Sequence, residues 1–139
     1  MFKNTPLLLI LITMNLFSQE WIQDKEQTRV SFKIKNFGLT VDGGFKTIDV
    51  NTNLDTKDLS NSYLNATILV NSIFTGIEAR DKHILETDYF DVLNHKKIIL
   101  KSSKFTKDKN GNITLFAELS IKGIIKKEEI PLEVFEDNS

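Results

Sequence analysis

The stretch Ser72–Asp91, which reads SIFTGIEARDKHILETDYFD, decides the fold because it is the one segment with a helical period in an otherwise alternating sequence. Thr75 is followed three residues later by Glu78, which is the spacing of a capping box, in which hydroxyl and carboxylate serve free backbone N–H groups. The apolar residues of the segment then fall on one helix face: Ile77, Ile84 and Leu85. The pattern predicts a single short helix that acts as a lid or plug at the end of a β-barrel.

On both sides of this helix, apolar and polar residues alternate along the sequence, as they do in half-buried strands. Ile98–Phe105 and Ile130–Val134 predict two further strands, and the slip between Phe45 and Ile48, ahead of Val50, suggests a β-bulge. Three runs alternate cleanly, and their inward-facing side chains are Val30, Phe32 and Ile34, then Leu64, Ala66, Ile68 and Val70, and finally Ile113, Leu115, Ala117, Leu119 and Ile121.

Turn residues separate these runs at short intervals. Asp108–Gly111 contains Asn-Gly, the strongest short hairpin signal, and predicts that the strands on either side pair. Asp42–Gly44 permits either a tight reversal or a close backbone approach, and Asp55–Asn61 predicts a polar loop. Pro131 lacks a backbone donor, so its strand should lie at a sheet edge or begin near this residue.

Strands with a single apolar face must bury it, and one antiparallel sheet of about six to eight strands can do so by curling into a barrel. We therefore predict an all-β protein, an antiparallel lipocalin-like β-barrel with one short helix. Its interior could be packed by its own side chains or could hold one small ligand. Alternation leaves both open. Because no inward position on the clean strands is charged, a bound molecule should be long and apolar.

The first 18 residues have the pattern of a secretory signal peptide: a basic start at Lys3, an apolar run over Leu7–Phe17, and a small residue, Ser18, at the cleavage point. The apolar run is shorter than the roughly 20 residues of a membrane span. We predict export, with an uncleaved anchor as the alternative, and therefore a periplasmic or secreted protein with no stable membrane insertion. Residues 19–139 then form one domain.

Composition narrows the class of partner. The full chain has 18 basic and 19 acidic residues and no cysteine. Lysines alternate with acidic residues without a clustered basic stripe, so we expect no nucleic-acid partner. Without cysteine, neither a disulfide nor lipid attachment to an N-terminal cysteine is available.

Taken together, the motifs resemble those of the YceI-like, polyisoprenoid-binding family over nearly the whole of the predicted domain. The specific part is Arg80-Asp81-x-His83-Ile84 followed by Asp88-Tyr89-Phe90-Asp91-Val92. The other matching positions are Asp24, Val30-x-Phe32-x-Ile34-Lys35, Val41-x-Gly43-x-Phe45, Ser72-Ile73-x-Thr75, Lys101-Ser102 and Leu119-x-Ile121-Lys122-Gly123. The resemblance implies an exported, lipocalin-like barrel whose tunnel holds the isoprenoid tail of a quinone or prenyl phosphate.

This resemblance and the inward stripes together define a predicted ligand site. We expect a non-enzymatic lipid-binding protein whose partner is an isoprenoid lipid or quinone-like small molecule, with no other cofactor, no metal and no catalytic residue. The residues expected to contact the ligand are Phe32, Ile34, Phe45, Ile68, Phe90, Leu115 and Leu119, with Arg80, Asp81 and His83 from the helical segment.

The sequence departs from the family pattern at three places and at its end. Gln27-Thr28 stands where the family has His-Ser, Asn36 where it has His, and His95-Lys96 where it has Tyr-Pro. Family members also continue through further strands beyond the position of Ser139. We expect a truncated barrel, the alternative being closure with fewer strands, and an open edge would permit oligomers.

Two other function classes stay open. An enzyme or metal-dependent protein would use Arg80, Asp81 and His83, although helix capping or ion pairing is the favoured explanation of this cluster. Zinc binding by His83 and His95 with Asp88 or Asp91 would need a spacing that matches no established ligand pattern. The third class is an inert structural domain.

Overall fold

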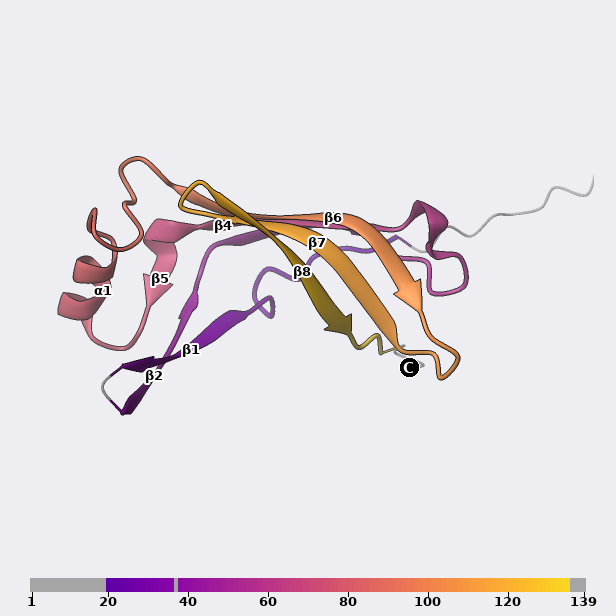
Figure 1. The fold of residues 1–139 in the computed structure, drawn as a ribbon, viewed down its shortest axis with the longest axis horizontal. Helices are drawn as coiled ribbons and strands as arrows, with labels where there is room; N and C mark the ends of the chain where they lie inside the picture. The colour runs from indigo at the N-terminus through magenta and orange to yellow at the C-terminus, as the bar shows by residue number, and fades with distance from the viewer. Residues whose placement is uncertain (1–19, 37, 136–139) are drawn as a thin grey trace, which may run out of the picture.

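The polypeptide forms two antiparallel β-sheets and one short α-helix, in a computed structural model that describes residues 20–36 and 38–135 (Figure 1). The smaller sheet has the order β1-β2-β5, with β1 (Val30–Asn36), β2 (Leu39–Phe45) and β5 (Ile73–Phe74). The larger sheet has the order β3-β4-β6-β7-β8, with β3 (Ile48–Asn53), β4 (Tyr63–Leu69), β6 (Lys97–Lys107), β7 (Ile113–Ile121) and β8 (Ile124–Leu132).

The helix and two 3₁₀ turns complete the described elements: α1 (Glu78–Ile84), η1 (Leu59–Asn61) and η2 (Val70–Ser72). The prediction of an antiparallel all-β fold with one short helix is confirmed. The signal peptide predicted for residues 1–18 lies outside the described residues. Among those described, no helix is both long enough and apolar enough to cross a bilayer.

The alternation seen in the sequence places the core. On β7, Ile113, Leu115 and Ala117 are buried, whereas Glu118 on the other face is exposed. The main core cluster lies where the two sheets meet and consists of Phe45, Ile48, Ile68, Val70, Ile73 and Ile98. Side chains from α1 and from β7 pack against this cluster, so the helix is joined to both sheets by apolar contact.

The predicted bulge between Phe45 and Ile48 is wrong, because the chain changes sheets there. Phe45 ends β2, which pairs with β5, and Ile48 begins β3, which pairs with β4. The backbone N–H of Lys46 donates to the carbonyl of Ser72 (3.1 Å), and the N–H of Thr47 donates to its hydroxyl (3.0 Å). β2–β3 and β4–β5 therefore bend together at a corner, and the slip in alternation records this corner.

The corner also explains why the barrel prediction is only partly correct. A single curled sheet was expected, but the chain forms two sheets, and each of the edge strands β1, β3, β5 and β8 pairs on one side only within residues 20–36 and 38–135. The barrel is not closed in this part of the chain. Pro131 lies on β8 opposite Thr114, at the sheet edge where a residue without a backbone donor was predicted.

The turn predictions succeed at Asn110-Gly111 and fail in part at Gly43-Gly44. β6 and β7 pair from Lys107 and Ile113 outward, and Gly111 has a φ of +89°. The side chain of Asn112, and next its backbone N–H, donate to the Asp108 carboxylate and hold the pKa of Asp108 below its usual range. Gly43-Gly44 makes no reversal, because both residues lie inside β2.

These two glycines instead allow a close approach of neighbouring strands. A β-carbon at Gly44 would lie 2.6 Å from the carbonyl oxygen of Val30, and one at Gly43 would overlap the ring of Phe32. The close-approach alternative is therefore confirmed. The reversal itself follows Asn36, which pairs with Leu39, and includes Gly38 with a φ of +78°.

The free edge of β3 is covered by the segment that precedes β1. The side-chain amide of Gln23 donates to the carbonyl of Ile48 and accepts from the N–H of Val50, both at 2.9 Å. One side chain thus satisfies a donor and an acceptor that a neighbouring strand would otherwise pair, which protects the edge. Trp21 Nε1 also donates to the carbonyl of Leu54 at 2.7 Å.

Candidate functional site

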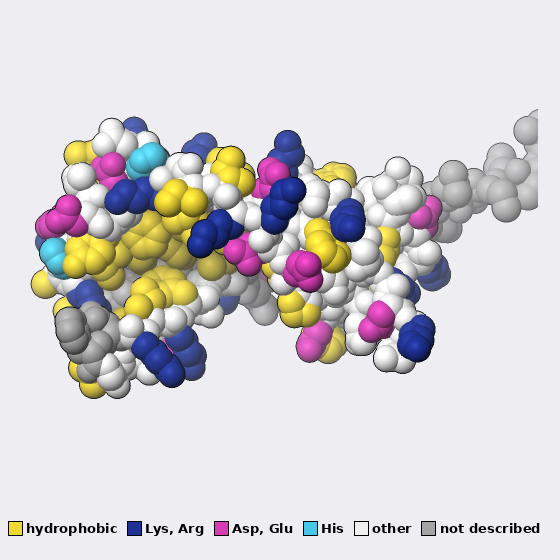
Figure 2. Space-filling view, in the orientation of Figure 1, with side chains coloured by type: hydrophobic (Ala, Val, Ile, Leu, Met, Phe, Trp, Pro, Cys, Tyr) yellow, Lys and Arg dark blue, Asp and Glu magenta, His cyan; other side chains and the backbone are white. Residues whose placement is uncertain are grey.

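An apolar groove with a volume of about 1050 Å³ lies between the two sheets at the α1 end of the molecule. The volume is at the upper end of the range of about 300–1,000 Å³ for ligand pockets. Ten of the sixteen lining side chains are apolar or aromatic: Phe32, Ile34, Val41, Ile73, Ile84, Tyr89, Phe90, Leu119, Ile121 and Ile124. Figure 2 shows a hollow with a continuous hydrophobic floor and charged groups around it. The groove can therefore bury an apolar molecule along its length.

The segment after α1 aims two aromatic rings at this groove. It folds back on the helix because the N–H of Phe90 donates to the carbonyl of Ile84 and that of Val92 to the carbonyl of Leu85. Asp91 is buried with a φ of +49°, and its carboxylate accepts two hydrogen bonds from the Asn94 side chain at 3.0 and 3.1 Å. This closed turn holds Phe90 and Tyr89 against the groove.

The wall of the groove is supported from behind by Phe45. Its ring lies 5.7 Å from that of Phe32 and 6.1 Å from that of Phe90, in an edge-to-face arrangement in the second case. Both distances are in the range favoured by aromatic pairs. Phe45 therefore links the smaller sheet to the segment after α1 and fixes the positions of two lining rings without lining the groove itself.

The structure separates the predicted ligand residues into two groups. Six of them line the groove: Phe32, Ile34, Arg80, His83, Phe90 and Leu119. The other four do not line it: Phe45 and Ile68 are buried in the core cluster, Leu115 is 1% exposed, and Asp81 accepts a hydrogen bond from Thr75. Whether any of the ten contacts a ligand stays a prediction.

The two groups arise because the inward face of each sheet extends beyond the groove, so some inward-facing residues line the groove and others lie in the core. Phe32, Ile34 and Leu119 line the groove, whereas Ile68 and Leu115 are buried under other side chains. Alternation identifies the face of the sheet and leaves the depth of each position open.

The predicted capping box does not form. α1 has Ile77 at its N-cap with no side-chain hydrogen bond, and Thr75 is instead buried beneath the first turn. The Thr75 hydroxyl donates to the Asp81 carboxylate at 2.5 Å and accepts from Arg80 Nε at 2.7 Å, while Arg80 Nη2 donates to the Thr75 carbonyl at 2.6 Å. Thr75 therefore orders Arg80 and Asp81 of α1, and the capping-box prediction was wrong because the N-cap is Ile77, two residues after Thr75.

Replacing Thr75 with valine should lower the free energy of unfolding by about 1–2 kcal/mol, because hydrogen bonds to two partly buried charged groups are lost at nearly constant volume. Hydrogen exchange should show reduced protection of α1, and urea denaturation gives the stability. The matched control is Thr106→Val, at an exposed position on β6. Equal effects of the two substitutions would show that the Thr75 network does not organise the helix.

The Arg80, Asp81 and His83 cluster divides between two separate sets of contacts. Arg80 and Asp81 both bond Thr75, whereas His83 Nδ1 lies 3.1 Å from Glu86 Oε2 and its ring lies 4.9 Å from that of Tyr89. Nor do the two histidines converge: His95 Nε2 lies 3.9 Å from the Asp91 carboxylate. Within the described residues, no three His, Asp or Glu side chains are grouped so that they could hold a metal ion.

Charged lining residues on β8 were missed by the sequence reasoning, which began this strand only at Ile130. The strand starts at Ile124, after a two-residue turn in which Lys122 and Gly123 have φ values of +49° and +74°. Alternate residues of the first half of β8 line the groove: Ile124, Lys126 and Glu128. A Lys-Gly turn between two apolar positions was the signal available in the sequence.

Comparison with known protein families gives one match that covers most of the chain. The model of the YceI-like domain matches residues 21–139. A UPF0312 protein of Staphylococcus aureus is 32% identical over 111 residues, which are 79% of this chain and 62% of that protein. A UPF0312 protein of Vibrio parahaemolyticus is 27% identical over 105 residues, which are 75% of this chain and 56% of that protein. The chain thus spans less than two thirds of these curated relatives.

Solved structures show the same architecture. The crystal structure of BcnA from Burkholderia cenocepacia superimposes with a TM-score of 0.78 at 21% identity, over 83% of this chain and 72% of that one. At this identity the match supports the fold. The YceI protein of Campylobacter jejuni superimposes with a TM-score of 0.62 at 27% identity, over 81% of this chain and 67% of that one.

Proposed function

The chain belongs to the YceI-like family, and we propose that it is an exported, non-enzymatic binding protein that holds the chain of an isoprenoid-type lipid in the groove between its two sheets. The observation that carries this proposal is the groove itself, about 1050 Å³ in volume and lined mainly by apolar side chains. Export is inferred from the signal-peptide pattern of residues 1–18.

The energetics of such a site favour an elongated apolar molecule. Burial contributes about 25 cal/mol per Å² of apolar surface, before the cost of association and of ordering the chain. Aromatic rings at Phe32 and Phe90 offer flat surfaces to the methyl-branched, unsaturated units of an isoprenoid, and Phe45 holds both rings in place. Arg80 and Asp81 already bond Thr75, and His83 lies against Glu86, so the three side chains do not converge on one point, which favours binding over catalysis there.

Native mass spectrometry of the full-length protein, purified from its own host, tests the proposal directly. We expect an apolar molecule to co-purify and to be recovered by organic extraction. A metal in place of such a molecule would support the enzyme or metal-dependent alternative, and neither one would support a purely structural domain. Both of these results contradict the proposal.

Substitution of Ile34 by aspartate should reduce the co-purifying apolar mass at least tenfold, because a carboxylate in an apolar site must either lose its hydration or exclude the ligand. Ile34 lines the groove while its side chain stays 48% exposed, so stability should change little. The control is Ser31→Asp, at an exposed position on the opposite face of β1. A folded Ile34→Asp variant with the normal apolar load would show that the groove is not the binding site.

A further inference from the structure

The register between β7 and β8 puts two opposite charges on the groove side of an edge strand. Lys126 pairs with Leu119 and Glu128 pairs with Ala117. Residues that face each other across an antiparallel pair project from the same side of the sheet. Because Ala117 is buried and Leu119 lines the groove, Lys126 and Glu128 lie on the same side, and both line the groove. Their sequence neighbours Lys127 and Glu129 lie on the outer face.

The charged side chains that line the groove differ in how far they are already engaged. Arg80 donates to Thr75, and Lys122 donates to the carbonyl of Thr87 at 2.8 Å. Lys126 and Glu128, by contrast, form no salt bridge or side-chain hydrogen bond with any other described residue, and neither do they pair with each other within 4 Å. Their charges are therefore available to a molecule in the groove.

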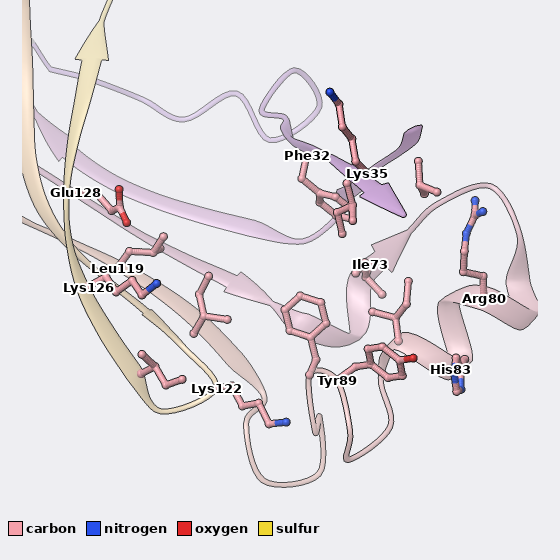
Figure 3. Close-up of a pocket in the computed structure, with 16 residues that line it drawn as sticks. Phe32, Lys35, Ile73, Arg80, His83, Tyr89, Leu119, Lys122, Lys126 and Glu128 are labelled. Atoms are coloured by element: carbon pink, nitrogen blue, oxygen red, sulfur yellow. The ribbon is translucent and has the colours of Figure 1, made fainter. Parts of the chain in front are cut away.

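The close-up places Lys126 at one end of the apolar surface (Figure 3). Its amino group points from β8 toward the interior of the pocket beside Leu119, whereas Lys35 extends away from the centre. The lining charges are positive at Lys35, Arg80, Lys122 and Lys126 and negative at Glu128. A site with this excess of positive charge favours an anion over a neutral group, and Lys126 is the unengaged lysine whose amino group points into the pocket.

We propose that Lys126 binds the anionic end group of an amphiphile whose chain lies in the groove along Leu119, Ile121 and Phe90. This inference rests on the proposed lipid-binding function and adds the chemistry of the ligand's polar end: a single-chain lipid with a phosphate or carboxylate terminus is bound more tightly than its uncharged analogue. Glu128, two residues along the same face, repels that anion and moderates its affinity.

The doubled sequence Ile124-Ile125-Lys126-Lys127-Glu128-Glu129 supplies a matched control for each substitution. Isothermal titration should compare farnesyl phosphate with farnesol, two probes with the same chain and different end groups. Lys126→Gln should lower the affinity for farnesyl phosphate about five- to tenfold, which is the effect of one charge-assisted hydrogen bond at an exposed site. Glu128→Gln should raise the affinity for farnesyl phosphate about two- to threefold. Neither substitution should change the affinity for farnesol.

The controls Lys127→Gln and Glu129→Gln alter the same charges on the outer face and should leave both affinities within twofold of the wild type. Thermal denaturation should show that all four variants retain the wild-type midpoint. Inorganic phosphate at the same concentration should not displace farnesyl phosphate, since the apolar chain supplies most of the affinity.

Several results would overturn the inference while leaving the proposed function intact. These are equal affinity for the two probes, equal effects of Lys126→Gln and Lys127→Gln on farnesyl phosphate, or a parallel loss of farnesol binding in Lys126→Gln. Displacement by inorganic phosphate alone would show a free-anion site and would also contradict the inference. If the wild-type protein binds neither probe, the proposed function itself fails, which is a distinguishable result.

Discussion

Replacing Leu115 with alanine should lower the free energy of unfolding by about 2–5 kcal/mol, because the side chain is almost completely buried and its removal leaves a cavity. Leu115 is 1% exposed at the centre of β7, and Ile130 of β8 lies opposite it. Urea denaturation, with the slope of the transition checked for two-state behaviour, gives the change.

The control for this substitution is Leu93→Ala, which removes the same atoms from a side chain that is 83% exposed. It should change stability by no more than about 0.5 kcal/mol. A similar small change for Leu115→Ala would mean that this face of β7 is open to water. That result would move Leu115 from the core into an extended groove, as the sequence alone suggested.

The Gly44→Ala substitution should destabilise the protein by about 2–3 kcal/mol, because overpacking here meets backbone rather than a flexible side chain. The added carbon would lie 2.6 Å from the Val30 carbonyl and 3.0 Å from the Phe74 ring. Since β2 pairs with β1 on one side and β5 on the other, the strand has no free direction in which to move. Hydrogen exchange should show the loss of protection first in β1 and β2.

Ser31→Ala is the matched control, because Ser31 is the exposed residue that faces Gly44 across the β1–β2 pair. Removing its hydroxyl should have almost no effect on stability. Wild-type stability in Gly44→Ala would mean that the strands can separate without loss, and the close approach of β1 and β2 would then have no structural role.

Local features of the chain could be predicted wherever one physical rule dominates. The helix over Glu78–Ile84, the hairpin at Asp108–Gly111 and the edge position of Pro131 all follow from periodicity or from backbone chemistry that few residues can satisfy. The capping box failed because Thr75 has a stronger alternative: its hydroxyl meets Arg80 and Asp81, and tertiary contacts override a local pattern.

Local sequence patterns could not predict whether the sheet closes or which inward-facing residues line the groove. The corner at Lys46–Thr47 depends on hydrogen bonds to Ser72, which lies 25 residues away. Such a contact leaves only a slip in the alternation, which has the same appearance as a bulge. Likewise, Leu115 and Leu119 share one face of one strand, and only the arrangement of the neighbouring elements makes the first a core residue and the second a groove residue.

The order of residues alone was enough to assign the faces of most strands and the apolar nature of the inward surface, because successive side chains of a strand point to opposite faces. The helical period of one segment likewise identified the single helix. Alternation could not assign the faces of the first half of β8. In Ile124-Ile125-Lys126-Lys127-Glu128-Glu129 each residue type occurs at both odd and even positions, so alternation carries no information about faces. Only the pairing of Lys126 with Leu119, a tertiary contact, places Lys126 and Glu128 in the groove. Their sequence neighbours Lys127 and Glu129 then lie on the outer face.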